Sequence, residues 1–190
     1  MKKSKIVIID NYDSFVFNLI RYIEEISDTT VSVMRNNRLN DEELEDADII
    51  ILSPGPGIPS EAGRLMEVIE KYVFTKKILG VCLGHQALGE FFGMKLKQCN
   101  EPIHGKTSRI NCNTDNVLYR GLENKMDVGR YHSWEVTQTD LSQMETIAET
   151  DDGMIMSIQH RELPIFGMQY HPESILTPNG RKQIENFLKL

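Results

Sequence analysis

Hydrophobic positions in the first half of the chain form short continuous runs, separated by segments in which apolar residues recur at helical spacing. Four runs predict strands that are buried on both faces: residues 5–9, 30–34, 48–52 and 77–81. Helical spacing predicts three helices between and after these strands: one that Asp13 caps, one at about 61–74, and one after Gly84 that ends at Gly93. Continuous apolar strands that alternate with helices indicate a parallel sheet covered on both faces.

The second half of the chain has a different pattern. Residues 94–168 form short strand-like segments separated by Asn, Asp and Gly, and residues 178–190 predict a final helix. We therefore expect an α/β fold in which an open, mainly parallel sheet flanked by helices carries an antiparallel extension. A chain of 190 residues suits one core, so residues 1–190 are expected to form a single domain.

A candidate nucleophile follows the fourth predicted strand. Cys82 lies in Gly80-Val81-Cys82-Leu83-Gly84, between a strand and a helix. This is the nucleophile-elbow pattern with cysteine in place of serine, in which glycines relieve the crowding of a sharp turn. The helix N-terminus would favour the thiolate, which is the reactive form. A lone cysteine is usually a small buried hydrophobe, and we assign that role to Cys99 and Cys112.

A candidate base lies near the end of the chain, in Gln169-Tyr170-His171-Pro172-Glu173-Ser174. Pro172 should hold His171 in an extended conformation, so Glu173, two residues on, would lie on the same side. A carboxylate there would orient the ring and stabilise the imidazolium. By itself, His-x-Glu could equally be a solvated loop, and the elbow at Cys82 favours the catalytic interpretation.

A third motif, Ser53-Pro54-Gly55-Pro56-Gly57, follows the third predicted strand. Alternating Pro and Gly make a rigid loop that could direct a backbone N–H toward a developing oxyanion, with the N–H of Leu83 as the second donor. An ordinary surface loop is the alternative.

The composition argues against several classes of function. The formal charge is −7 and no dense basic run occurs, which disfavours nucleic-acid binding. No apolar run approaches the roughly 20 residues of a membrane span. The three cysteines lack metal-ligand or disulfide spacing, so a reducing cytoplasm fits best.

Together, the three motifs resemble the signatures of class I (triad-type) glutamine amidotransferases: Pro54-Gly55-Pro56-Gly57, Gly80 to Gln86, and His171-Pro172-Glu173-Ser174. The resemblance implies a flavodoxin-like fold. Four further segments resemble the glutaminase subunit of anthranilate synthase and of aminodeoxychorismate synthase: residues 10–15, 61–63, 104–106 and 130–133.

The resemblance also implies roles for individual residues. Cys82 would form a γ-glutamyl thioester, with His171 moving protons and Glu173 orienting it. Gly57 and Leu83 would supply the oxyanion hole. Four residues would hold glutamine: Gly55, Gln86, Ser133 and Trp134.

No metal or organic cofactor is implied on this chain, and any Mg²⁺ would belong to the partner. That partner would be a chorismate-utilising synthase subunit near residues 11–14 and 104–106. We favour anthranilate synthase and keep three alternatives: the aminodeoxychorismate synthase glutaminase or one shared by both enzymes, a hydrolase acting alone on γ-glutamyl compounds, and a non-enzymatic flavodoxin-like module.

Overall fold

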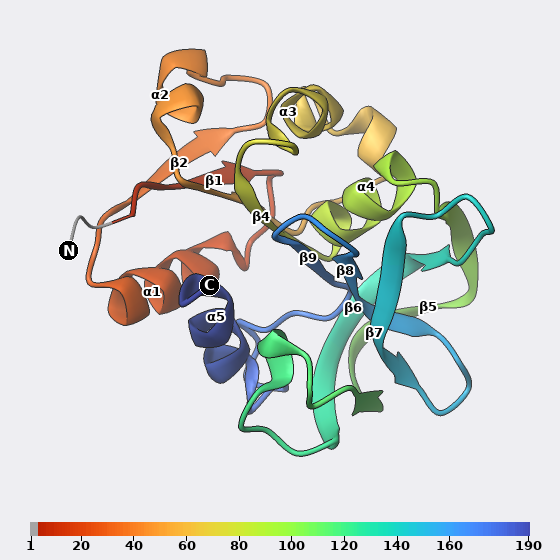
Figure 1. Cartoon of the computed structure of the whole chain (residues 1–190). Helices are drawn as coiled ribbons and strands as arrows, with labels where there is room; N and C mark the ends of the chain where they lie inside the picture. The colour runs from red at the N-terminus through yellow and green to blue at the C-terminus, as the bar shows by residue number, and fades with distance from the viewer. Residues whose placement is uncertain (1–3) are drawn as a thin grey trace.

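The computed structural model describes residues 4–190, and this part of the chain contains a nine-stranded mixed sheet in the order β2-β1-β3-β4-β9-β8-β7-β5-β6 (Figure 1). The strands that pair in parallel are β1 (Ile6–Asp10), β2 (Val31–Arg35), β3 (Ile49–Leu52), β4 (Lys77–Val81) and β9 (Ile165–Met168). The antiparallel extension consists of β5 (Lys95–Cys112), β6 (Lys125–Thr137), β7 (Met144–Thr150) and β8 (Ile155–His160).

Helices cover both faces of the parallel strands. They are α1 (Val16–Ser27), α2 (Asp41–Asp46), α3 (Leu65–Tyr72), α4 (Leu83–Phe91) and α5 (Gly180–Leu188). Helices α1 and α5 lie together on one face, and α3 and α4 lie together on the other (Figure 1). The predicted architecture, an open, mainly parallel sheet with helices and an antiparallel extension, is confirmed.

The continuous apolar runs have a direct explanation in the packing of β1. Ile6 and Ile8 belong to the core cluster under α1 and α5, whereas Val7 and Ile9 belong to the cluster under α3 and α4. Successive side chains of a strand point to opposite faces, so a strand between two helical layers needs apolar residues at every position. Each such side chain contributes roughly 1.5–3 kcal/mol when fully buried.

The antiparallel extension differs from the expectation of short segments. Strand β5 has 18 residues and β6 has 13, and the two form a long ribbon. The polar residues that suggested breaks lie within β5, because its pairing with β6 shifts register between Gln98 and Ile103 and again between His104 and Lys106. Much of β5 is exposed, so polar residues cost it little.

Two local expectations were also wrong, and one helix was not foreseen. Asp13 does not cap α1: the N-cap is Phe15, and Asp13 instead accepts a hydrogen bond from the Phe15 N–H at 2.7 Å. Helix α3 begins only at Leu65, after the 3₁₀ turn Pro59–Glu61. The six-residue helix α2 was not predicted, because it buries only Leu44 and has no apolar stripe.

A search of residues 4–190 for helices long and apolar enough to cross a membrane finds none.

Candidate active site

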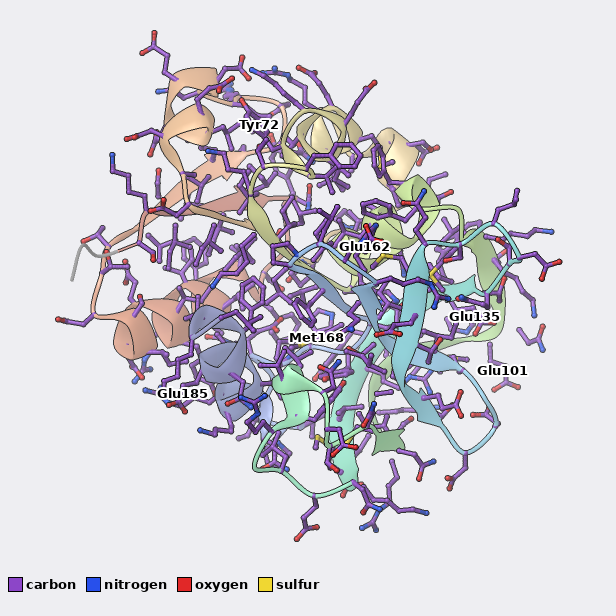
Figure 2. All side chains as sticks on the ribbon, in the orientation of Figure 1. Tyr72, Glu101, Glu135, Glu162, Met168 and Glu185 are labelled. Carbon is purple, nitrogen blue, oxygen red and sulfur yellow. The ribbon has the colours of Figure 1, made fainter. Side chains whose placement is uncertain are left out.

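Cys82 occupies the sharp turn between β4 and α4. Its φ is 51° and its ψ is −100°, a backbone conformation that residues other than glycine rarely adopt. Its N–H donates to the carbonyl of Met168 at 2.7 Å, and Met168 lies in the interior of the molecule, at the end of β9 (Figure 2). The neighbouring strand therefore holds the strained turn in place.

The glycines on either side of Cys82 allow backbone to pack directly on backbone. A Cβ on Gly80 would lie 2.4 Å from the carbonyl carbon of Gly84, and a Cβ on Gly84 would lie 2.3 Å from the carbonyl oxygen of Leu52. Real Cβ atoms do not approach so closely, and backbone cannot swing aside as a side chain can. The Gly-x-Cys-x-Gly spacing is therefore required by close packing between the elbow and β3.

His171 and Glu173 form a buried pair beside this turn. Nδ1 of His171 lies 2.7 Å from Oε1 of Glu173, and the two residues are 2% and 3% exposed. The route by which they meet differs from the expected extended segment. The N–H of Ser174 donates to the carbonyl of His171, so Pro172 and Glu173 form the middle of a tight turn.

The His171 ring is enclosed by aromatic side chains and by the thiol. Phe15 and Tyr131 contact it edge-on, with ring centroids 5.5 and 5.0 Å away. Burial opposes a positive charge there, but the interactions with Cys82 and Glu173 outweigh it and raise the pKa of His171 well above its ordinary value. The site therefore favours the protonated form of the His171 ring. Phe15, which the sequence indicated as a helix residue and as part of the family-like segment 10–15, is an additional member of this site.

The loop that carries His171 is fastened to β6. The N–H of His171 donates to the carbonyl of Gly129 at 3.0 Å. In return, the Gly129 N–H donates to Oγ1 of Thr177 at 2.9 Å, and that hydroxyl donates to the His171 carbonyl at 2.7 Å. These reciprocal bonds fix the base relative to the antiparallel half of the sheet.

A cavity of about 280 Å³ opens at Cys82. The residues that line it include six of the nine predicted site residues: Gly55, Gly57, Cys82, Gln86, Ser133 and Trp134. Four lining residues were not predicted as site residues: Pro56, His104, Tyr131 and His132. The remaining predicted residues, Leu83, His171 and Glu173, are buried and do not line the cavity. The sequence indicated three of these lining residues only as parts of segments that resemble the family: His104, Tyr131 and His132.

The Pro-Gly loop is held at the cavity by Asn11. The Asn11 side chain donates to the carbonyl of Ser53 at 2.9 Å, and a Cβ on Gly55 would lie 2.5 Å from Cβ of Asn11. Gly57 has a φ of 77°, which favours glycine. Leu83, the first residue of α4, has a backbone N–H without an intrahelical acceptor. Gly57 lines the same cavity as Cys82, and Leu83 directly follows Cys82 at the start of α4.

Gln86 connects α4 to β6, the far wall of the cavity. Its Nε2 donates to the carbonyl of Trp134 at 2.9 Å and to Oε1 of Gln169 at 3.1 Å. Gln169 in turn donates to Sγ of Cys82 at 3.7 Å. Sequence reasoning did not identify Gln169, although it lies two residues before His171, at the end of a buried strand.

His85 is fully buried, and neither ring nitrogen has a hydrogen-bond partner among the described residues. Burial lowers its pKa from 6.5 to about 3, so the ring is neutral. Over residues 4–190, no group of three or more His, Cys, Asp or Glu side chains has a geometry that could hold a metal ion.

The chain belongs to the family described as glutamine amidotransferase class-I, whose model matches residues 7–190. The fold agrees with this assignment. A solved structure described as a glutamine amidotransferase from Thermotoga maritima has a TM-score of 0.82, with 12% identity, over 100% of this chain and 98% of that one.

Curated relatives are closer in sequence. "Bifunctional protein TrpGD" of Thermotoga maritima is 44% identical over 98% of this chain, but the chain spans only 32% of that protein. "Aminodeoxychorismate/anthranilate synthase component 2" of Bacillus subtilis is 41% identical over 97% of this chain and 95% of the relative. "Anthranilate synthase component 2" of Lactococcus lactis is 42% identical over 96% of this chain and 93% of the relative.

Proposed function

We propose that this protein is the glutaminase subunit of anthranilate synthase, hydrolysing glutamine through Cys82, His171 and Glu173. The main support for this chemistry is the setting of Cys82. The cysteine has a strained backbone and lines a cavity, and it lies beside the buried His171–Glu173 pair, in which the pKa of His171 is raised. A buried cysteine of purely structural use would need neither the strained turn nor the charged neighbour.

In the proposed reaction, Sγ of Cys82 attacks the side-chain amide carbon of glutamine. The C–N bond breaks as His171 gives a proton to the departing nitrogen, so ammonia leaves and a γ-glutamyl thioester remains. His171 then accepts a proton from water, whose oxygen attacks the thioester and releases glutamate and the thiolate. Glu173 keeps Nδ1 of the ring protonated, so Nε2 is the atom that exchanges protons.

The remaining predicted residues have separate tasks in this proposal. The N–H groups of Gly57 and Leu83 stabilise the oxyanion of each tetrahedral intermediate. Gly55 lines the glutamine pocket, and Gln86, Ser133 and Trp134 hold the amino-acid end of glutamine. Support for this division is that Gly55, Gly57 and these three residues share one cavity with Cys82. The proposed reaction uses no cofactor on this chain.

The released ammonia passes to a separate chain, which is a chorismate-utilising synthase subunit. This part of the proposal rests on the relatives, two of which are named as second components of a synthase. We place the partner against residues 11–14 and 104–106, because His104 lines the cavity and Tyr12 is a half-exposed aromatic. The protein acts in the cytoplasm, which suits three free cysteines, and residues 1–190 form a single domain.

The name of the Bacillus subtilis relative supports a second candidate function, as the glutaminase subunit of aminodeoxychorismate synthase or as one shared by both enzymes. The two candidates use the same glutaminase chemistry. They differ only in the large subunit that receives ammonia, so only an experiment with both large subunits separates them.

The test measures glutamate release from glutamine by wild type and by Cys82→Ser, alone and with each of the two candidate large subunits. Cys112→Ser is a matched control, because Cys112 is a buried free cysteine on β5 that does not line the cavity. We expect activity that requires Cys82, survives Cys112→Ser and rises with the large subunit of anthranilate synthase, which then forms anthranilate. Full activity in Cys82→Ser would refute the mechanism, and hydrolysis indifferent to both partners would indicate a stand-alone hydrolase.

A further inference from the structure

A chain of buried hydrogen bonds reaches the sulfur of Cys82. Its last member is Gln169, which is 0% exposed. Nε2 of Gln169 donates to Sγ of Cys82 at 3.7 Å, and its Oε1 accepts from Nε2 of Gln86 at 3.1 Å. Because both ends of this amide are engaged, Gln169 cannot rotate without losing a bond, and its N–H group stays directed at the sulfur.

Gln86 transmits this constraint to the wall of the cavity. Its Nε2 has two hydrogens, and the structure gives both an acceptor: Oε1 of Gln169 and the carbonyl of Trp134. Only Oε1 of Gln86 is left for a ligand, so it can accept from a donor such as an ammonium group and cannot donate. The atoms that bind the substrate are therefore connected to the atoms that hold the thiol.

The Trp134 carbonyl can only accept, so it decides which end of the Gln86 amide faces it, and Arg130 decides the tautomer of the His132 ring that shares this acceptor. A guanidinium can only donate, and its Nε donates to Nε2 of His132 at 3.0 Å. The hydrogen of the His132 ring is therefore on Nδ1, which donates to the Trp134 carbonyl at 2.9 Å. Burial and the Arg130 charge lower the pKa of His132 to about 3, so the ring stays neutral and this tautomer persists.

We propose that Gln169 is a positioning residue for Cys82: its amide N–H holds Sγ as a thiolate facing the glutamine cavity, in an orientation fixed through Gln86, Trp134, His132 and Arg130. A neutral donor stabilises the sulfur anion without competing with His171 for the proton. The inference rests on the proposed function for its meaning in catalysis, but the hydrogen bond itself can be tested without glutamine.

The same protein contains a matched comparison. Gln183, on α5, is also 0% exposed, and its Nε2 donates to Sδ of Met126 at 3.0 Å. It has the same burial and the same amide-to-sulfur contact as Gln169, but a thioether carries no charge and performs no attack. Replacing either glutamine by methionine preserves side-chain volume and removes the donor. A purely structural role predicts that neither substitution changes the pH dependence of Cys82 alkylation.

The experiment compares wild type, Gln169→Met and Gln183→Met. The first measurement is the pH dependence of Cys82 alkylation by iodoacetamide, followed on the Cys82 peptide by mass spectrometry. We expect Gln169→Met to move the midpoint upward by about one pH unit, the size expected for loss of one hydrogen bond to an anion. Gln183→Met should leave the midpoint unchanged.

The second measurement is glutamate release with the large subunit present. We expect Gln169→Met to lower kcat about tenfold with a smaller change in KM, and Gln183→Met to leave both unchanged. If Gln169→Met does not fold, Gln169→Glu, which has the same shape, replaces it. Its carboxylate would repel the thiolate, so the midpoint should rise further.

An unchanged alkylation midpoint in a folded Gln169 variant would overturn the inference, whatever the activity. A shifted midpoint in a protein that releases no glutamate with any partner would leave the hydrogen bond established and refute the proposed function instead. The two failures are therefore distinguishable.

Discussion

The parallel and antiparallel halves of the sheet contribute different things to the site. The parallel strands are short, the central ones β1, β3 and β4 are buried on both faces, and the ends of β3 and β4 lead into the Pro-Gly loop and Cys82. The long β5–β6 ribbon is largely exposed along β5 and supplies Ser133, Trp134 and the anchor for His171. The proposed nucleophile, Cys82, thus lies where backbone packs closely against backbone. The proposed substrate contacts lie on a ribbon whose strand β5 is largely exposed.

The largest effect should come from breaking the buried His171–Glu173 pair. In Glu173→Gln the shape is preserved, but the charge that raises the pKa of His171 and orients its ring is lost. We expect kcat for glutamate release to fall about 100-fold or more while the fold is retained. Exposed Glu123→Gln is the control and should match wild type. Wild-type kcat in Glu173→Gln would remove the carboxylate from the mechanism.

A smaller effect should follow from filling the close contact at the elbow. Gly84→Ala places a Cβ against the carbonyl of Leu52, so backbone must move, and we expect a loss of about 3 kcal/mol in the free energy of unfolding. Gly89→Ala on the same helix meets a side chain, Cγ1 of Val136, at 2.8 Å and should lose less. Urea denaturation measures both. Equal losses would show that the elbow packs no more tightly than the rest of α4.

The buried histidines should make stability fall in acid. His85 has a pKa lowered to about 3, so between pH 6.5 and 3 the unfolded chain binds a proton that the folded chain refuses. The free energy of unfolding should therefore decrease by about 1.4 kcal/mol per pH unit from this group as pH falls through that window. His85→Gln should remove this contribution to the dependence of the free energy of unfolding on pH.

Exposed His104→Gln is the control for this experiment and should retain the slope. His132→Gln should reduce the slope as His85→Gln does, because burial and Arg130 lower the pKa of His132 to about 3 as well. A slope that is the same in wild type and in both buried-histidine variants would contradict the assignment.

The smallest effect is expected on the antiparallel ribbon. Lys97 and Glu135 form a cross-strand ion pair at 3.7 Å, with Lys97 54% exposed. Water and salt screen such pairs, so Lys97→Gln should change the free energy of unfolding by less than about 0.5 kcal/mol. Glutamate release should be unaffected. A loss comparable to that of Gly84→Ala would mean that the ribbon is as tightly constrained as the elbow.

The contrast between the parallel and antiparallel halves of the sheet also explains which features could be predicted from the sequence. In the parallel half, burial on both faces imposes continuous apolar runs, and the elbow imposes Gly-x-Cys-x-Gly, so strands and nucleophile were both recognisable. In β5, exposure and register shifts allow Asn100 and Gly105 inside a strand, and the period-2 pattern is lost. Gln169 was missed because its role depends on contacts with residues 86 and 82, more than eighty positions away, which no local pattern encodes.

The pairing of β4 with β9 also determines when the protein becomes reactive. Val81 lies opposite Met168, and the bond that holds the Cys82 turn comes from that late strand. Contacts between such distant segments form slowly, after the local ones, and during translation they wait until residues 165–171 have been made. The nascent chain therefore lacks the bond that holds the Cys82 turn until β9 has been made.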